Sequence, residues 1–378
     1  MRSAITQHQL NRALALRDLS DPASGPHAMQ LVAGAVAGAL EREWRCPVPV
    51  HRASPIVTIA DNYETLGYAA DAPAREARYT RYVDDRRLLR THMTAAVPAA
   101  LRDLVRPDGP DDLVVACPGL VYRRDVVDRM HVGEPHQLDL WRIRRGASLT
   151  VRDLDEMISL VVSAIVPGIA HHTSAASHPY TTDGRQVDVD VGDGWVELLE
   201  CGLAAEHVLH AGGLDPERWS GLALGVGLDR ALMLRKGISD IRLLRSPDPR
   251  VAGQMLDLEP YRAVSAMPPT RRDLSVAVAD DLTTEELGDR IRERVEPDRL
   301  EAIEELLVVA ETPGAALPPQ AIARIGLRPG QKNVLVRLVL RHPTRTLTAE
   351  EANRTRDDVY EAIHEGGVYE WAGRKASP

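Results

Sequence analysis

The sequence lacks features that define several large classes of protein. Its three cysteines, Cys46, Cys117 and Cys201, lie far apart without CxxC spacing, which argues against a disulfide framework and a cysteine-based zinc site. No apolar run reaches the ~18 residues of a membrane-spanning helix. The N-terminal stretch contains Asp18 and Asp21 and no apolar signal-peptide core, so we expect a cytoplasmic protein without a membrane partner.

Basic charge and phenylalanine are also scarce. The formal net charge is −9, which gives no general attraction to nucleic acid, and we expect no DNA partner. The chain contains no phenylalanine and only three lysines, a bias that GC-rich coding would produce. The rest is ordinary, because 44% hydrophobic and 27% charged residues are typical of a soluble protein with a full core. A length of 378 residues predicts two domains.

The most distinctive stretch runs from Cys117 to Trp141. It reads as a short apolar strand at 120–122, a loop crowded with charged residues, and a returning strand at 137–141. An arginine that follows a buried strand, such as Arg123, is rigid, always protonated and able to bind phosphate or carboxylate oxygens in a bidentate way. Gln137 and Asp139 are two apart on the return strand, so they face the same side and could hold an ammonium or amide group. The alternative is a solvated hairpin loop.

A second polar cluster lies before this hairpin. Residues 1–24 are polar and form an arm, and apolar residues at helical spacing predict amphipathic helices over 26–44 and 149–165. Between these helices, residues 79–83 read as a strand and 88–94 as a second strand or the start of a helix. This second segment ends in a guanidinium, an imidazole and two hydroxyls, a density of polar groups that favours a site over a structural histidine. These groups belong to Arg90, Thr91, His92 and Thr94.

Two strands at 185–191 and 195–202 follow, and the second carries Glu197 and Glu200. Residues three apart in a strand point to opposite faces, so we expect only one of these glutamates to face a site. A carboxylate near a phosphate-binding arginine would suit Mg²⁺, which takes oxygen ligands and substrate phosphates.

Glycines and an arginine mark the segment 220–242. Gly221, Gly225 and Gly227 precede a helix, but neither the dinucleotide-binding nor the P-loop spacing is complete. Glycines within a strand indicate instead that a flat ligand or another backbone approaches closely. Arg230 then lies in the first turn of the helix, where backbone donors and the helix dipole already favour an anion.

The last part of the chain predicts a separate small domain. Residues 246–270 are rich in proline and indicate a linker. Strand, helix, strand, strand and helix then follow up to residue 364, with Thr284 and Glu285 near the start of the first helix, an order typical of a ferredoxin-like α+β domain. The expected divisions are an arm at 1–25, a catalytic domain at 26–250, a linker at 251–270, the small domain at 271–366 and a tail at 367–378.

Three of these motifs resemble class II aminoacyl-tRNA synthetases of the phenylalanyl-tRNA synthetase α-chain type. LLRTHMTAAVP (88–98) resembles that family's LRTHTS segment, VYRRDVVDRMH with HQLDLW (121–141) resembles its motif 2, and GLALGVGLDRALMLRKGISDIR (221–242) resembles its motif 3. PPTRRDLSVAV and RTLTAEEAN are similar to the ferredoxin-fold anticodon-binding domain of single-chain members. The resemblance covers most of 26–365. It implies an α+β fold, with a class II antiparallel sheet flanked by helices and a small ferredoxin-like domain.

In this family an amino acid carboxylate attacks the α-phosphorus of ATP, pyrophosphate leaves, and the acyl group moves to the 3′ end of tRNA. Fixed cations are the chief requirement, because two anions meet while charge builds on phosphate oxygens. The resemblance implies that Arg123 contacts the α-phosphate and the substrate carboxylate and that Arg230 holds the γ-phosphate, which makes them the catalytic pair. It also implies that Mg²⁺ bridges phosphates with help from Glu197 or Glu200. The remaining residues that it assigns are Arg124, Asp125, Gly225 and Gly227 to ATP, and His92, Thr94, Gln137, Asp139, His178, Tyr180, Cys201 and Gly202 to the amino acid.

The amino-acid pocket departs from the family pattern. Where the family has Phe-Pro-Phe followed by Thr-Glu-Pro-Ser, the chain has HPYTTD at 178–183. His178 adds a titratable group to an apolar pocket, and Thr182 replaces the expected acidic residue, so a metal ligand has moved or vanished. Asp139 replaces the usual glutamate. A buried hydrogen-bonding group rejects substrates that cannot satisfy it, so we expect an aromatic or bulky amino acid that is not necessarily phenylalanine.

We therefore expect an AMP-forming ligase that transfers an activated amino acid to tRNA. The chain could act alone, as a homodimer or with a separate β-type chain, and its built-in small domain suggests that no β chain is needed. The alternative is a paralogue that passes the acyl group to a small molecule, peptide or carrier protein; a catalytically silent homologue is a third hypothesis, which the presence of Arg123 and Arg230 disfavours. Residues 262–365 contain 15 Lys plus Arg against 19 Asp plus Glu, a net charge of −4, so this region would bind RNA only if its arginines share one face. Those arginines are Arg271, Arg272, Arg341, Arg345, Arg354 and Arg356.

Overall fold

The computed structural model describes residues 4–77, 79–106, 108–192, 194–264 and 267–369, and it contains two compact units. The first unit comprises Met1–Arg123, Glu134–Ser239 and Gly253–Tyr261, and the second comprises Arg124–Gly133, Asp240–Ala252 and Arg262–Pro378. The expected division at 250 and 271 therefore misses two segments, 124–133 and 240–252, that pack with the second unit. Most of the expected tail lies outside the described residues. No helix within the described ranges is long and apolar enough to cross a membrane.

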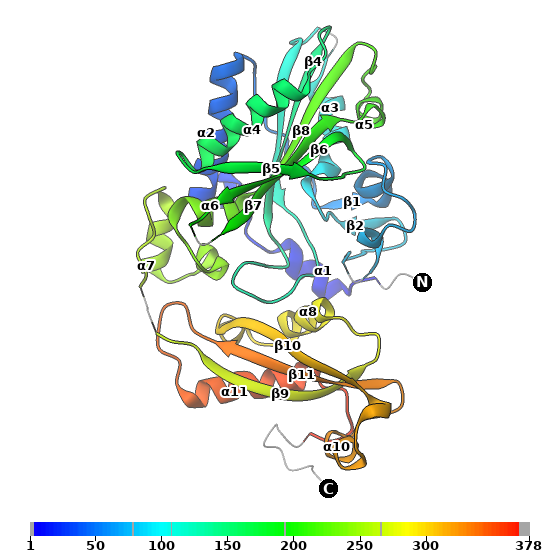
Figure 1. The fold of residues 1–378 in the computed structure, drawn as a ribbon, viewed down its shortest axis with the longest axis vertical. Coiled ribbons are helices and arrows are strands. Elements are labelled where there is room, and N and C mark those ends of the chain that lie inside the picture. Colours follow the sequence, from blue (N-terminus) through cyan, green and yellow to red (C-terminus); the bar gives the residue numbers. More distant parts are fainter. Residues whose placement is uncertain (1–3, 78, 107, 193, 265–266, 370–378) are drawn as a thin grey trace. The chain divides into compact units, whose positions relative to one another are not determined.

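A six-stranded sheet forms the first unit (Figure 1). Every neighbouring pair is antiparallel, and the order is β3-β4-β8-β7-β6-β5. The order places the motif 2 return strand beside the motif 3 strand, with Gln137 opposite Gly227, so segments far apart in the sequence share one edge of the site. The strands are β3 (Asp112–Leu120), β4 (His136–Arg145), β5 (His171–Ala175), β6 (Thr181–Asp190), β7 (Trp195–Ala204) and β8 (Trp219–Gly227).

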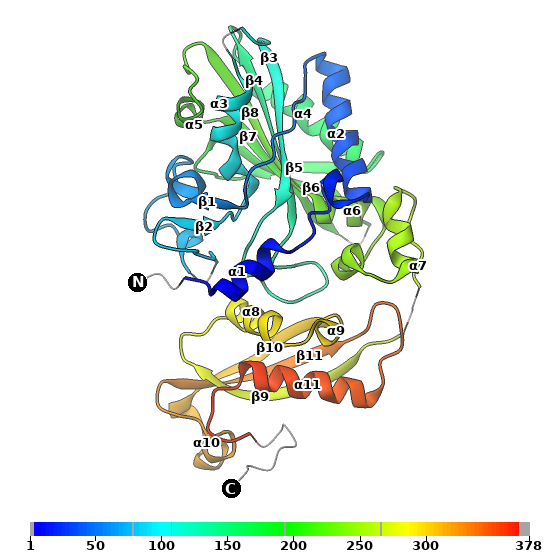
Figure 2. The same cartoon turned by 180° about the vertical axis from the view of Figure 1, so that it is seen from behind.

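Helices cover both faces of this sheet, as Figures 1 and 2 show. On one face lie α2 (Ala28–Trp44), α4 (Val151–Ile165) and α6 (Leu228–Lys236). The other face packs on α3 (Val97–Leu104) and α5 (Glu206–Ala211), whose apolar side chains join Trp141 and Ala223 in one buried cluster. Side chains alternate along a strand, so every second residue faces each helical layer. The amphipathic helices predicted over 26–44 and 149–165 are confirmed by α2 and α4.

The N-terminal arm is folded onto the first unit. α1 (Gln7–Leu14) begins at a capping box between Thr6 and Gln9, and Ala13 is buried against Leu120 and Tyr122. β1 (Ile56–Thr58) pairs with β2 (Arg87–Leu89). The strand expected at 79–83 is reduced to isolated bridges from Tyr82 to Ala4 and Leu88.

The proline-rich stretch that indicated a linker is partly structured. It contains α7 (Pro249–Ala252) and a short 3₁₀ turn at Gly253–Leu256. Lys236 is fully buried at the end of α6, and its ammonium donates to the backbone carbonyls of Asp257 and Glu259 and to the Asp257 carboxylate at 2.6–2.9 Å. A buried cation needs its donors satisfied, so this ammonium fixes residues 257–259 within the first unit.

The second unit has a three-stranded antiparallel sheet in the order β10-β11-β9. Its buried core lies between this sheet and the helices α8 and α11. The three strands and two long helices predicted from the sequence are present in the expected order, with the unpredicted short helices α9 and α10 between them. The cap of α8 is Thr283 with Glu286 rather than the pair one residue away. The elements are β9 (Thr270–Ala279), α8 (Thr284–Arg294), α9 (Pro297–Leu300), β10 (Ile303–Pro313), α10 (Pro319–Ile325), β11 (Gln331–Leu340) and α11 (Ala349–Ile363).

Candidate active site

Two arginines of the first unit are held by backbone carbonyls. Arg123 follows β3 and donates from Nε to the carbonyl of Thr91 at 2.9 Å. Arg230 lies in the first turn of α6 and donates from Nη1 to the carbonyl of Glu197 at 3.1 Å. Within the described ranges neither guanidinium forms an ion pair. A carbonyl orients a guanidinium without cancelling its charge, so both cations keep donors for an anion.

A bulge in β7 brings the two glutamates of this strand together. Val187 faces Leu199, Asp188 faces Glu197 and Gln186 faces Glu200, so the register slips by one residue at Leu198. Gln186 and Asp188 are two apart on β6 and share a face, where their side chains are joined by a 2.8 Å hydrogen bond. Glu197 and Glu200 therefore share that face as well. The expectation that they point to opposite faces is wrong, because alternation fails across a bulge.

The charges of Arg123 and Arg230 affect the pKa values of these carboxylates. Burial raises the pKa of Glu197 and the charge of Glu200 raises it further, whereas the charges of Arg230 and Arg123 lower it. The pKa of Glu200 is lowered by its hydrogen bond to His178 and by Arg123. Arg123 and Arg230 thus act on one carboxylate although they stand far apart in the sequence. Both arginines therefore lie near the face of the sheet that bears Glu197, and their role in catalysis stays a prediction.

The same carboxylates fit a magnesium ion that also binds phosphate. Within the described ranges no group of three or more His, Cys, Asp and Glu side chains could hold a metal by itself. Mg²⁺ usually takes one or two carboxylates and completes its shell with water and substrate phosphates. Glu197 and Glu200 are two carboxylates on one face, and the charge of Glu200 adds to the effect of burial in raising the pKa of Glu197, so the pair suits this partial donor set.

Polar groups from β4 and the segment after β2 lie beside the arginines. Asp139 is 4% exposed, and burial raises its pKa to about 6 although Thr94, Trp141 and Arg123 lower it. Gln137 accepts the backbone N–H of Met93 at 3.1 Å through its side-chain oxygen. A buried carboxylate whose pKa burial has raised gains from a cationic partner, which is what a substrate ammonium provides.

His92 presents a neutral imidazole to the same region. Burial, and next the charge of Arg123, lower its pKa to about 3. Both ring nitrogens are buried, and neither has a hydrogen-bond partner among the described residues. Buried polar atoms are nearly always paired, so this exception marks a position that a ligand could satisfy.

Aromatic rings surround His92. Its ring stacks on those of Tyr68 and Tyr180 at centroid distances of 5.7 and 6.5 Å, and Tyr180 stacks on His178 at 5.4 Å. His178 in turn lies 3.2 Å from the Glu200 carboxylate through Nε2. Burial raises the pKa of Tyr68 to about 12, so the phenol stays neutral. The predicted residues His92, His178 and Tyr180 are therefore brought together by the fold.

The glycines have different neighbours. A Cβ on Gly225 would lie 3.3 Å from the Asp139 carboxylate, so this glycine keeps the site face of β8 open, while Gly227 has only Arg230 near it. A Cβ on Gly202 would lie 2.6 Å from the Thr181 side chain, so Gly202 serves packing between β6 and β7.

Cys201 does not belong to this face. It follows Glu200 in β7 and points the other way, beside Arg185 and Asp155 of α4, and burial raises its pKa to about 12. The prediction that Cys201 contacts the amino acid is therefore corrected, because strand alternation turns its side chain to the opposite face.

Arg124 and Asp125, predicted for ATP, belong to the second unit. The Arg124 Nε lies 3.4 Å from the Asp289 carboxylate on α8. Arg292 donates to the carbonyls of Asp125 and Val126 at 2.8 and 2.6 Å, and the N–H of Leu306 donates to Val127 at 2.8 Å. The start of the charged loop is therefore packed within the second unit, and a role in ATP binding stays a prediction.

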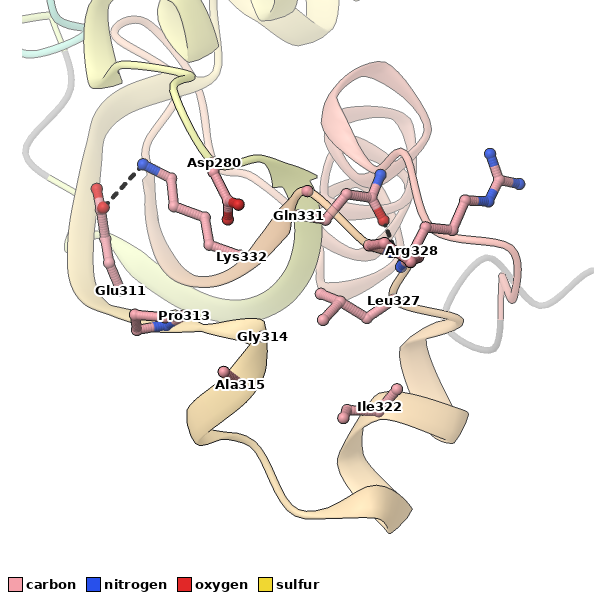
Figure 3. Close-up of a pocket in the computed structure, with 12 residues that line it drawn as sticks. Asp280, Glu311, Pro313, Gly314, Ala315, Ile322, Leu327, Arg328, Gln331 and Lys332 are labelled. Atoms are coloured by element: carbon pink, nitrogen blue, oxygen red, sulfur yellow. Dashed lines mark hydrogen bonds and ion pairs between the residues drawn. The ribbon is translucent and has the colours of Figure 1, made fainter.

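A cavity of about 900 Å³ lies in the second unit, between β10, α10 and β11 (Figure 3). None of the predicted site residues lines it. The Lys332 ammonium is 2.9 Å from the Glu311 carboxylate and donates to the carbonyl of Leu282, and Gln331 accepts the N–H of Arg328. Because these polar groups satisfy one another, we place the candidate active site on the first unit.

Sequence reasoning missed two contributors to the site. Tyr68 completes the ring cluster, and Asn62 holds Thr91 through two hydrogen bonds of 2.9 and 3.1 Å, which in turn positions Arg123. Both lie in 60–68, where neither strand nor helix periodicity gave a signal. The density of polar and aromatic residues in ADNYETLGY is the one cue that the sequence offered.

An antiparallel sheet with a motif 2 hairpin beside a motif 3 strand and helix is the architecture of a class II aminoacyl-tRNA synthetase core. Residues 50–255 match the family model described as the tRNA synthetases class II core domain (F), and the chain belongs to this family. The match contains the polar segment after β2, the charged hairpin and the glycine-rich strand.

Curated relatives agree with this family. The chain is 36% identical over 193 residues to a phenylalanine–tRNA ligase alpha subunit from Prochlorococcus marinus (strain MIT 9313), covering 51% of this chain and 56% of that protein. A protein of the same name from Leptospira biflexa is 34% identical over 212 residues, 53% of this chain and 60% of that one. The chain thus spans about half the length of the curated relatives it matches. Among solved structures, a pyrrolysyl-tRNA synthetase from Desulfitobacterium hafniense has a TM-score of 0.45 and 19% identity, covering 64% of this chain and 78% of that one.

Proposed function

We propose that the chain is an ATP-dependent ligase that activates an amino acid as its adenylate and transfers the acyl group to tRNA. The observation that carries this proposal is the convergence of two unpaired guanidiniums, Arg123 and Arg230, on a face that also holds paired carboxylates and a buried aspartate. Adenylate formation joins two anions, so it requires fixed cations that are not consumed by the protein's own acids.

The proposed roles follow from the charge of each group. Arg123 binds the α-phosphate and the substrate carboxylate, and Arg230 binds the far end of the triphosphate. Asp139 and Gln137 bind the substrate ammonium. The ion pair with this ammonium offsets the burial that raises the pKa of the Asp139 carboxyl. Glu197 and Glu200 would hold Mg²⁺, which supplies Lewis-acid neutralisation of the phosphates when bound.

The amino acid is proposed to be aromatic or bulky, with a group that hydrogen-bonds. The rings of Tyr68, Tyr180 and His178 offer an apolar wall, and the paired His178 and Glu200 add polarity at its end. A substrate that cannot satisfy such a polar group is disfavoured.

A different acceptor is the second candidate, and the second unit supports it. Its arginines are largely paired, as in Arg337 with Asp273 at 2.8 Å and Arg345 with Glu351 at 2.9 Å. Tyr360 and Tyr369 are the aromatic residues between 267 and 369; Tyr360 is fully buried, and Tyr369 alone of the two is exposed, at 44%. RNA-binding sheets stack bases on exposed aromatic side chains and release counterions through free cations. A small molecule, peptide or carrier protein is therefore the alternative acceptor.

ATP–pyrophosphate exchange with a panel of amino acids tests activation. We expect exchange with one aromatic or bulky amino acid, reduced at least ~100-fold by Arg230→Ala and unchanged by Arg337→Ala, whose guanidinium is already paired. No exchange with any amino acid would overturn the proposal, and exchange with phenylalanine alone at ordinary efficiency would overturn the altered specificity.

Charging of total tRNA then separates the two acceptors. We expect aminoacylated tRNA if the first candidate is correct. Adenylate formation without charging would favour the non-tRNA acceptor. Light scattering on the same sample tests the proposed homodimer.

A further inference from the structure

A buried histidine lies between the N-terminal arm and the helix that bears Arg230. His136 is the first residue of β4, and its side chain is 0% exposed. The backbone N–H of Leu19 donates to its Nε2 at 3.0 Å, and its Nδ1 lies 3.2 Å from the Asp229 carboxylate. A backbone N–H can only donate, so Nε2 carries the lone pair and Nδ1 carries the proton that is donated to Asp229. The Asp18 carboxylate lies farther from Nε2, at 3.7 Å.

The carboxylate of Asp229 binds His136 twice. Besides the ring, the backbone N–H of His136 donates to it at 2.5 Å, and Asp229 is 3% exposed. The β4–β8 ladder ends at Gln137 opposite Gly227, directly before the chain turns into α6. The His136–Asp229 contact therefore continues the link between these elements at the point where ladder hydrogen bonds stop.

We propose that His136 and Asp229 form a positioning dyad that fixes Arg230 relative to Gln137 and Asp139. Asp229 precedes Arg230 in the first turn of α6, and His136 precedes Gln137 on β4. The dyad touches no substrate in this scheme; it sets the spacing between the group that binds the triphosphate and the groups that bind the ammonium. Misplacement of a reacting group by ~1 Å costs on the order of 100-fold in rate. This inference rests on the proposed adenylation function, in that it assigns those two groups to one reaction.

The dyad differs from a buried histidine that merely satisfies its hydrogen bonds. His364 of the second unit is such a case: Nδ1 accepts the N–H of Ala277 at 3.1 Å and Nε2 lies 3.0 Å from the carbonyl of Val368. His364 is 4% exposed, and it accepts a hydrogen bond from β9, a strand that contains no predicted site residue. His364→Gln is therefore a matched control for the loss of a buried imidazole.

Two substitutions at His136 separate its two hydrogen bonds. In His136→Asn the short amide can still donate to Asp229 but cannot reach Leu19, whereas in His136→Gln the longer amide can accept from Leu19 and loses the donor at the Nδ1 position. Four quantities are measured for each variant: the KM for ATP, the kcat of pyrophosphate exchange, ATP affinity by calorimetry, and amide hydrogen exchange across the first turn of α6.

We expect His136→Gln to lower kcat/KM for ATP by about ten-fold or more and to speed amide exchange at residues 229–231. We expect His136→Asn to lose less than His136→Gln in both measurements, and His364→Gln to change stability alone. Equal losses in both His136 variants, in proportion to their thermal destabilisation, would overturn the dyad, as would unchanged amide exchange in His136→Gln. If the wild-type protein shows no pyrophosphate exchange, the proposed function fails, while amide exchange and calorimetry still decide for or against the dyad.

Discussion

The two site arginines of the first unit and two arginines of the second unit are held in opposite ways. In the first unit, Arg123 and Arg230 donate to the carbonyls of Thr91 and Glu197, and neither forms an ion pair within the described ranges. In the second unit, Arg242 binds both oxygens of Asp240 and Arg337 binds both oxygens of Asp273. A carbonyl holds a guanidinium in place without neutralising it, whereas a carboxylate consumes the charge that a phosphate would need.

The acids show the same contrast. Burial raises the pKa of Asp139 and of Glu197 in the first unit, whereas the hydrogen bonds of Arg337 lower the pKa of Asp273 in the second. Perturbed carboxylates beside unpaired cations are typical of sites that await a charged ligand. The Asp273–Arg337 pair of the second unit is instead complete without one.

Removing the unpaired cations gives the largest expected effect. Arg123→Ala and Arg230→Ala should each lower amino-acid-dependent pyrophosphate exchange by ~100-fold to ~1000-fold, because the developing charge on the phosphates loses a fixed donor. The measurement is the exchange rate at saturating ATP. Arg337→Ala serves as the control from the second unit. Retention of more than half the rate in Arg230→Ala would remove the distinction between the two sets of arginines.

Neutralising Asp139 tests the anionic half of the same site. Asp139→Asn should raise the KM for the amino acid by ~10-fold to ~100-fold, because a hydrogen bond to a charged group contributes about 1.5–3 kcal/mol. The KM for ATP should change far less. A matched substitution, Asp273→Asn, should alter neither constant. An unchanged KM for the amino acid in Asp139→Asn would place the ammonium elsewhere.

The same substitution should stabilise the free protein. Burial raises the pKa of Asp139 from 3.8 to about 6, so the folded state favours the protonated form and ionisation opposes folding. The resulting penalty is absent below pH ~4, grows between pH ~4 and ~6, and stays constant above that at no more than about 3 kcal/mol. Urea unfolding at pH 8 should therefore show Asp139→Asn to be more stable than wild type, and the gain should shrink to about half at pH 5. A gain that is equal at both pH values would contradict the assigned cause.

The smallest effects are expected from arginines of the second unit. Arg292→Ala removes two hydrogen bonds to the carbonyls of Asp125 and Val126 and should lower the free energy of unfolding by about 1–3 kcal/mol. Arg337→Ala breaks an exposed pair and should leave urea unfolding unchanged within error. Pyrophosphate exchange should survive both changes. A loss of exchange in Arg292→Ala at full stability would show that the charged loop takes part in the reaction.

Much of the fold followed from local pattern. Helical spacing located α2 and α4, and the order of the three strands and two long helices of the second unit was predicted correctly, because apolar periodicity records which face of an element is buried. The short helices α9 and α10 were not predicted. The strand expected at 79–83 failed, since β-propensity depends on a partner and Tyr82 found only isolated bridges.

The sequence alone predicted which residues carry the proposed chemistry: Arg123 after a buried strand, Arg230 at the start of a helix, and Gln137 and Asp139 on one face of a strand. Only the tertiary structure decided which of the other groups join them. The slip at Leu198 is a property of the register between β6 and β7, so it turned Glu197 toward Glu200 although their spacing in the sequence predicted opposite faces. Strand alternation turns Cys201 away from this face, and no single strand encodes its partner's register. Tyr68 and Asn62 lie outside the strands, and they join the other groups through tertiary contacts with His92 and Thr91.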